Sequence, residues 1–131
     1  MSQENVELVR RIFEGWSRGD FSVGADLLAP EFEWQQHAEA VEPGVRRSDE
    51  VGNSLRNIFE IYENFRVEPD DFVDAGEKVV VTARVSGTER RTGLPVHGSW
   101  EFVWTVQGGR LVRNEVYANR ADALEAAGLS Q

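Results

Sequence analysis

The amino-acid sequence predicts an α+β fold in which N-terminal helices pack against a mostly antiparallel sheet. Apolar residues recur at helical spacing in the first half of the chain, and beyond Asn64 the period changes to two. Short turns that contain glycine separate the alternating segments in this second half. A length of 131 residues is typical of one domain, which we expect to span residues 1–131.

The first apolar stripe predicts an amphipathic helix, formed by Val6, Val9, Ile12, Phe13 and Trp16. Gly19 is placed to end this helix, and Asp20 can cap the next one. We expect that short second helix to run through Leu27 and to stop before Pro30, because the residue before a proline disfavours helical backbone angles.

The stretch EFEWQQH, residues 31–37, alternates like a strand with one apolar face. Phe32 and Trp34 point to the same side, so the next inward position is Gln36. Either Gln36 lies outside the core, or the interior of the protein holds something polar.

Ser48, after a loop containing Pro43 and Gly44, can cap a third helix with a clear apolar stripe: Val51, Leu55, Ile58, Phe59 and Tyr62. Strands are predicted at residues 65–75, 78–88, 96–107 and 110–118. Asn119 can cap a short last helix.

Alternation separates the last three strands into two faces. The set expected to cover the core is Val79, Val81, Ala83, Val85, Gly98, Trp100, Phe102, Trp104, Val106, Val112, Asn114 and Val116. The opposite set contains Arg84, Glu101, Arg113 and Glu115, which we expect to form cross-strand charge pairs on a solvated or interfacial surface. Val103 and Tyr117 lie on that face too, which suggests that part of it is covered, for example by another subunit.

Composition narrows the classes of function. A net charge of -9 disfavours nucleic acid and anionic membranes as partners. The absence of cysteine excludes disulfides and thiolate chemistry, and two distant histidines predict no metal site. The N-terminus lacks the apolar run of a signal peptide and no stretch reaches membrane-spanning length, so we expect a cytoplasmic protein.

Three stretches resemble the SnoaL-like family of the nuclear transport factor 2-like superfamily: ENVELVRRIFEGWSRGDFSVGADLLAPEFEW, NFRVEPDDFVDAG and FVWTVQGGRLVRNEVYANRADALEAAGL. The resemblance covers nearly the whole chain. It implies a curved sheet wrapped around the helices to form a cone with an internal pocket, and a homodimer packed through the sheet. The superfamily includes ketosteroid isomerases, polyketide cyclases, epoxide hydrolases and pocket-bearing proteins without chemistry, so the fold does not decide the activity.

The resemblance places Gln36 about where the isomerases carry their general-base aspartate. It places Ile12 and Phe102 at the positions of their oxyanion hole. None of these side chains exchanges a proton near neutral pH, which argues against ketosteroid isomerase chemistry. Epoxide hydrolase chemistry is disfavoured too, because the last-strand aspartate of those enzymes matches Val116, and Glu115 lies on the opposite face.

The remaining acid/base candidate is His37, which fits the pocket mouth or a plain surface position. We expect the pocket to be lined by Trp16, Trp34, Gln36, Phe59, Tyr62, Trp100, Phe102, Asn114 and Val116, with Phe13 beside Trp16. The buried amides of Gln36 and Asn114 then meet a ligand, or they are satisfied by the Tyr62 hydroxyl, by each other and by water.

Two functions are consistent with this pocket. The first is the binding of a small, largely apolar ring compound, with cofactor-free isomerase, cyclase, hydratase or lyase chemistry if there is turnover. The alternative is a non-catalytic homodimeric association module in which side chains fill the cone.

Overall fold

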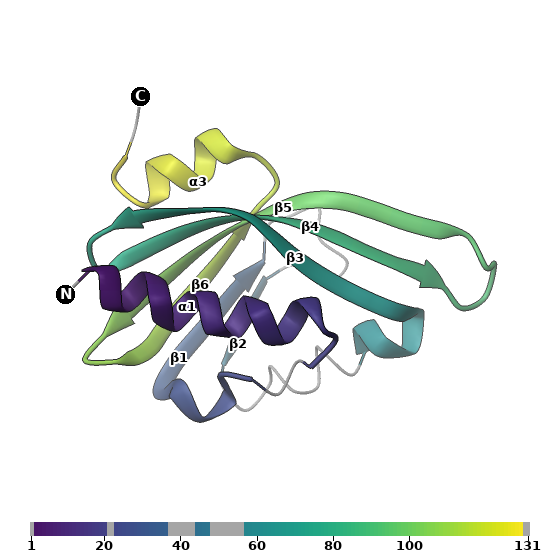
Figure 1. Ribbon diagram of the computed structural model, residues 1–131, viewed down its shortest axis with the longest axis horizontal. Helices are drawn as coiled ribbons and strands as arrows, with labels where there is room; N and C mark the ends of the chain where they lie inside the picture. Colours follow the sequence, from purple (N-terminus) through teal and green to yellow (C-terminus); the bar gives the residue numbers. More distant parts are fainter. Residues whose placement is uncertain (1, 21–22, 37–43, 48–56, 130–131) are drawn as a thin grey trace.

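We describe a computed structural model of the chain, for residues 2–20, 23–36, 44–47 and 57–129. The helices and strands are, in chain order, α1 (Ser2–Ser17), η1 (Ala25–Leu27), β1 (Leu28–Gln36), β2 (Gly44–Arg47), β3 (Tyr62–Ala75), β4 (Lys78–Glu89), β5 (Pro95–Gln107), β6 (Arg110–Tyr117) and α3 (Arg120–Ala126) (Figure 1). Residues 57–61 are helical as well. These elements confirm the predicted α+β class.

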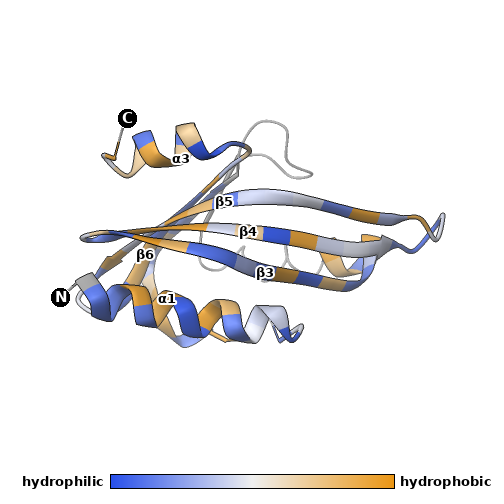
Figure 2. Cartoon of the chain, turned by 45° about the horizontal axis from the view of Figure 1, so that its top comes forward, coloured by the Kyte–Doolittle hydropathy of each residue, from blue (hydrophilic) through white to orange (hydrophobic). Residues whose placement is uncertain are grey.

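The strands form one six-stranded sheet in the order β2-β1-β6-β5-β4-β3. β1 and β6 run parallel, whereas the other neighbouring pairs are antiparallel. Figure 2 shows α1 and α3 on opposite sides of strands β3 to β5. We call the face that α1 covers the inner face, and the face that carries α3 the outer face.

The predicted first helix is confirmed. One side of α1 is buried against the inner face, and its buried apolar residues are Leu8, Val9, Ile12, Phe13 and Trp16. In Figure 2 hydrophobic and hydrophilic residues alternate along this helix, as an amphipathic helix requires. The helix ends before Gly19, whose φ of 86° few other residues adopt.

The segment after α1 differs from the prediction. The expected short helix is a single 3-10 turn, and β1 begins at Leu28 and continues through Pro30. A proline is tolerated there because the pairing of β1 with β6 is irregular between Leu28 and Glu33, so no ladder donor is missing. Gly44, which we expected in a loop, begins the short strand β2.

The prediction of Tyr62 at the end of a helix was wrong, since Tyr62 is the first residue of β3. Residues 48–56, the predicted start of that helix, lie outside the described residues. The later strands and their turns are confirmed, with Gly76, Gly108 and Gly109 all at positive φ.

The predicted inward residues of β4 do face the core, but the assignment in β6 needs correction. Leu111 belongs to the buried inner cluster, whereas Val112 is only partly buried. The cause is a β-bulge, because Val106 pairs with Leu111 and Thr105 then pairs with Arg113. Val112 is the extra residue, and alternation resumes at Arg113.

Part of the outer face is covered by the chain's own helix α3. Val80 and Val103 are fully buried with Ala123, and Tyr117 packs against this cluster. The Lys78 ammonium donates to the Ala126 carbonyl oxygen at 3.0 Å, which holds the end of α3 to the sheet. The covering that we attributed to another subunit is therefore provided, in this region, by α3.

The expected cross-strand charge pairs are confirmed for Arg84 of β4 and for Arg113 of β6, which lies 3.6 Å from Glu33 of β1, whereas Glu101 has an uncharged partner. Arg84 binds Asp70 at 2.8 Å, and Glu101 accepts a hydrogen bond from the Thr82 hydroxyl at 2.7 Å. The register of β4 and β5 places Ser99 opposite Arg84 and Thr82 opposite Glu101. Among the described residues, no helix is long and apolar enough to cross a membrane.

Candidate functional site

Three strands of the inner face bring two tryptophans to either side of one asparagine. Asn114 of β6 pairs with Trp34 of β1 and with Trp104 of β5. Side chains of directly paired residues point to the same face of a sheet, so these three side chains share the inner face. Two-residue alternation agrees, because Val116 lies in the inner cluster as well.

Trp16 of α1 completes a group that we call the tryptophan cluster: Trp16, Trp34 and Trp104. The ring centroids lie 6.0 Å apart for Trp16 and Trp34, 5.9 Å for Trp16 and Trp104, and 5.8 Å for Trp34 and Trp104. None of the three pairs is coplanar, and the planes of Trp34 and Trp104 are tilted by 85°. Tilted pairs at these distances are attractive through the ring quadrupoles.

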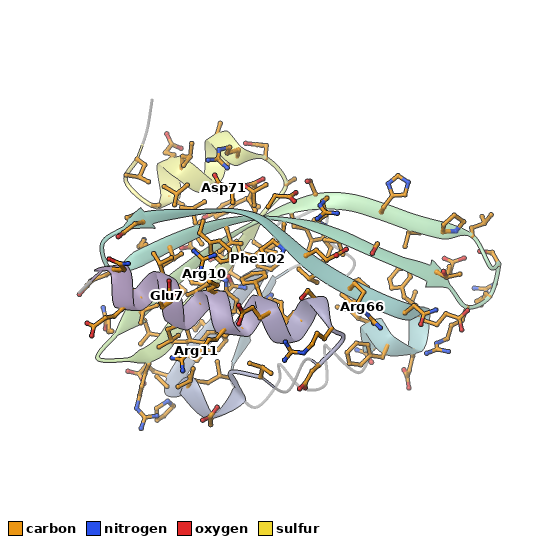
Figure 3. All side chains as sticks on the ribbon, viewed as in Figure 1. Glu7, Arg10, Arg11, Arg66, Asp71 and Phe102 are labelled. Carbon is orange, nitrogen blue, oxygen red and sulfur yellow. The ribbon has the colours of Figure 1, made fainter. Side chains whose placement is uncertain are left out.

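Phe102 connects this cluster to the rest of the inner face. Its ring stacks on that of Trp104 at 6.4 Å and meets Phe13 of α1 edge-on at 5.2 Å. Figure 3 shows Phe102 between α1 and the sheet. The Phe102 side chain packs into the core. By the resemblance, the ketosteroid isomerases carry an acid at this position.

Asn114 is the polar exception on this face. Its side chain is fully buried, and within the described part of the chain neither its Nδ2 nor its Oδ1 has a hydrogen-bond partner. The indole Nε1 of Trp104 is also buried without a described partner. A buried polar group without a partner costs about 1–3 kcal/mol, so such groups are rare in folded proteins.

The other predicted lining residues fall into two sets. Val116 is buried and pairs with Phe102, and the half-buried Trp100 contacts the Phe102 ring at 6.2 Å. Tyr62 stacks on Phe65 at 6.0 Å, at the start of β3. Phe59, by contrast, is 36% exposed, so the structure leaves it at the surface.

Gln36 and His37 cannot be placed in the site. The backbone of Gln36 is in β1 and pairs with Gly44, but its side chain lies outside the described residues. His37 is outside them altogether. The two roles that we assigned to these residues remain predictions.

A second polar group lies on the outer face, away from the tryptophan cluster. Arg113 lies 3.6 Å from carboxylate oxygens of Glu33 and Glu115 and donates to Gln35. The Tyr117 hydroxyl donates to Glu115 at 2.7 Å. Burial, together with this hydrogen bond to a carboxylate, raises the pKa of Tyr117 to about 12. This group stabilises the sheet and does not reach the inner face.

Trp104 is the site residue that sequence reasoning missed, although it was assigned to the inward set. The register expected for a regular β5–β6 hairpin does not reveal that Trp104 and Asn114 are paired. Counting back from the tight turn at Gly108 and Gly109 pairs Trp104 with Arg113, and the bulge at Val112 moves the partner to Asn114. Within the described residues there is also no group of three His, Cys, Asp or Glu side chains that could hold a metal ion.

A helix packed on the inner face of an open mixed sheet, with aromatic rings around a buried amide, defines an α+β protein of the cone-fold class. The model of the SnoaL-like domain family matches residues 9–114, and the chain belongs to this family. No curated protein matches the chain.

Solved structures agree with this assignment. An NTF2-like protein from Burkholderia thailandensis is 30% identical, with 96% of each chain covered and a TM-score of 0.79. An NTF2-like protein of unknown function from Burkholderia pseudomallei is 26% identical, with 92% of this chain and 95% of that chain covered and a TM-score of 0.76. TerC, co-crystallised with polyporic acid, shares the fold at 20% identity, with 95% of this chain and 98% of that chain covered and a TM-score of 0.73.

Proposed function

We propose that the chain binds a small, largely apolar ring compound at the inner face of its sheet, beside the tryptophan cluster. The observation that carries this proposal is the fully buried amide of Asn114 between Trp34 and Trp104, whose rings also contact Trp16. Apolar aromatic walls with a few polar atoms are the usual composition of a small-molecule site. The co-crystallisation of TerC with polyporic acid supports a small-molecule ligand for this fold.

The residues of the site favour binding over proton transfer. None of the side chains of Trp16, Trp34, Trp104, Phe102 and Asn114 ionises near neutral pH, so none can act there as a general base. If a ligand proves to be a substrate, we propose cofactor-free isomerase, cyclase, hydratase or lyase chemistry with His37 as the acid/base group. Full turnover by a His37→Ala variant would exclude that role.

Tryptophan fluorescence tests the binding proposal directly, because three of the four tryptophans form the cluster. The protein is titrated with steroids, monoterpenes and polyketide-like compounds. We expect a saturable change in emission for at least one compound, and a weakened response in Trp104→Phe. Asn5→Leu, which removes an amide that bonds Gly76 far from the cluster, should respond like the parent protein.

The second candidate is an association module whose interior is filled by its own side chains. It is favoured by the burial of Phe13, Phe102 and Trp104, each at most 1% exposed and all in mutual ring contact. This function predicts a flat fluorescence response to every compound. It also predicts that Gln36→Leu is at least as stable as the parent, because no ligand would need the amide.

A further inference from the structure

We propose that the ring of the bound compound carries an oxygen, as a ketone or a hydroxyl group, that hydrogen-bonds to Asn114 and Trp104. This inference rests on the proposed function and names the class of ligand. It is drawn from the buried polar atoms of the inner face that have no hydrogen-bond partner among the described residues, and from whether each atom donates or accepts.

The strand register brings the two residues that carry these atoms side by side. Asn114 and Trp104 are directly opposite in the antiparallel pairing of β5 and β6, and their Cα atoms are therefore about 5 Å apart. Both side chains lie on the inner face, and Trp34 borders Asn114 on the other side. The proposed ligand oxygen would therefore lie within reach of two neighbouring residues that each carry an N–H group without a described partner.

The balance of donors and acceptors selects oxygen. The Asn114 Nδ2 and the Trp104 Nε1 are both donors, and the Asn114 Oδ1 is the single acceptor among the three atoms. A ketone oxygen has two lone pairs and can accept from both nitrogens. A hydroxyl group can accept in the same way, or it can turn and donate to Oδ1.

An ammonium group suits the site less well. Three indole faces attract cations, but an ammonium has no lone pair to offer to the two N–H donors. Both donors would stay buried and unpaired with such a ligand. The structure therefore favours an oxygenated ring over a cationic one.

The first test uses the protein without any ligand. Asn114→Leu replaces the amide by an apolar side chain of similar shape. Because an unpaired buried amide destabilises the folded state, we expect the midpoint of thermal unfolding to rise, on the order of several degrees. Asn5→Leu should not raise it. A lower midpoint for Asn114→Leu would mean that the amide is already paired inside the protein, and this result would overturn the inference.

The second test compares matched ligands by ligand-observed NMR: α-tetralone, the hydrocarbon tetralin, and the amine that carries a protonated amino group in place of the ketone oxygen. We expect the ketone to bind about tenfold more tightly than tetralin, as one or two buried hydrogen bonds provide. The preference should disappear in Asn114→Leu, shrink in Trp104→Phe and persist in Asn5→Leu.

The outcomes separate the inference from the proposed function. Equal affinities of ketone and hydrocarbon, tightest binding of the amine, or a ketone preference that survives in Asn114→Leu would overturn the inference alone. Binding of none of the three compounds, together with a flat fluorescence panel, would overturn both.

Discussion

Gly15 leaves space between α1 and the segment that follows it. A Cβ atom at this position would lie 2.4 Å from Val23 Cγ2 and 2.8 Å from Val23 Cβ, far inside contact distance. The glycine is fully helical, so its role is to leave space and not to adopt an unusual backbone angle.

Gly15→Ala should therefore destabilise the protein by about 1–3 kcal/mol through overpacking, although alanine is the better helix former. The free energy of unfolding is measured by urea denaturation. Gly98→Ala is the matched control, because a Cβ there has no neighbour within 4 Å. If Gly15→Ala proves as stable as the parent, the close approach of Val23 to α1 is wrong.

For single residues, alternation in the sequence correctly predicted that Phe102, Asn114 and Val116 face the core. The sequence could not predict what Asn114 meets there. That depends on β1, which is far away in the chain, and on the pairing that sets Trp34 beside it. Local periodicity assigns a side chain to a face and carries no information about neighbours from distant strands.

The stability of helix α3 depends on the hydrogen bonding of its first turn. The Asn119 side chain accepts a hydrogen bond from the Asp122 backbone N–H at 2.9 Å and so caps the helix, as the sequence predicted. Since α3 covers Val80 and Val103, the cap also affects the burial of the outer face.

Asn119→Ala should lower the free energy of unfolding by about 1 kcal/mol, the usual cost of a lost N-cap. Asn119→Ser keeps an oxygen at the capping position and should retain most of the stability. Hydrogen exchange of the amides in α3 and of those beneath it in β4 reports the loss locally. Equal protection in the alanine and serine variants would contradict the capping role.

The β5–β6 hairpin shows what is missed when strands are predicted one by one from the sequence. Both strands were found from their alternation, yet Leu111 and Asn114 both face inward at a spacing of three, which only an extra residue permits. The alternative of an inward Val112 was equally consistent with the pattern, because both residues are apolar. Pairing with Val106 decides between them, and pairing is a tertiary property.

For the whole molecule, we propose that two copies associate through the part of the outer face that α3 leaves open. The described charges there are unbalanced: the carboxylates are Glu33, Glu68, Asp70, Asp71, Glu101 and Glu115, and the guanidinium groups are Arg84, Arg113 and Arg120. Two such faces repel each other at low ionic strength, and salt screens this repulsion.

The dimer should therefore tighten as the NaCl concentration is raised, which sedimentation equilibrium measures. Ser99→Glu adds a charge to the exposed outer face beside Arg84 and should weaken association. Gln3→Glu adds the same charge to the exposed side of α1 and should leave association unchanged. A monomer at every salt concentration, or a dimer that loosens with salt, would exclude this interface.

The parallel pairing of β1 with β6 has a consequence for the order in which the protein forms on the ribosome. Strands β3, β4 and β5 are joined by short turns and can pair as each one emerges. Leu28 and Trp34, by contrast, pair with Leu111 and Asn114, so β1 can pair early only with the short strand β2 and meets β6 after residue 114 has been synthesised. During that interval the apolar side of β1 lacks the neighbouring strand β6, and we expect chaperones that shield exposed hydrophobic strands to bind the nascent chain.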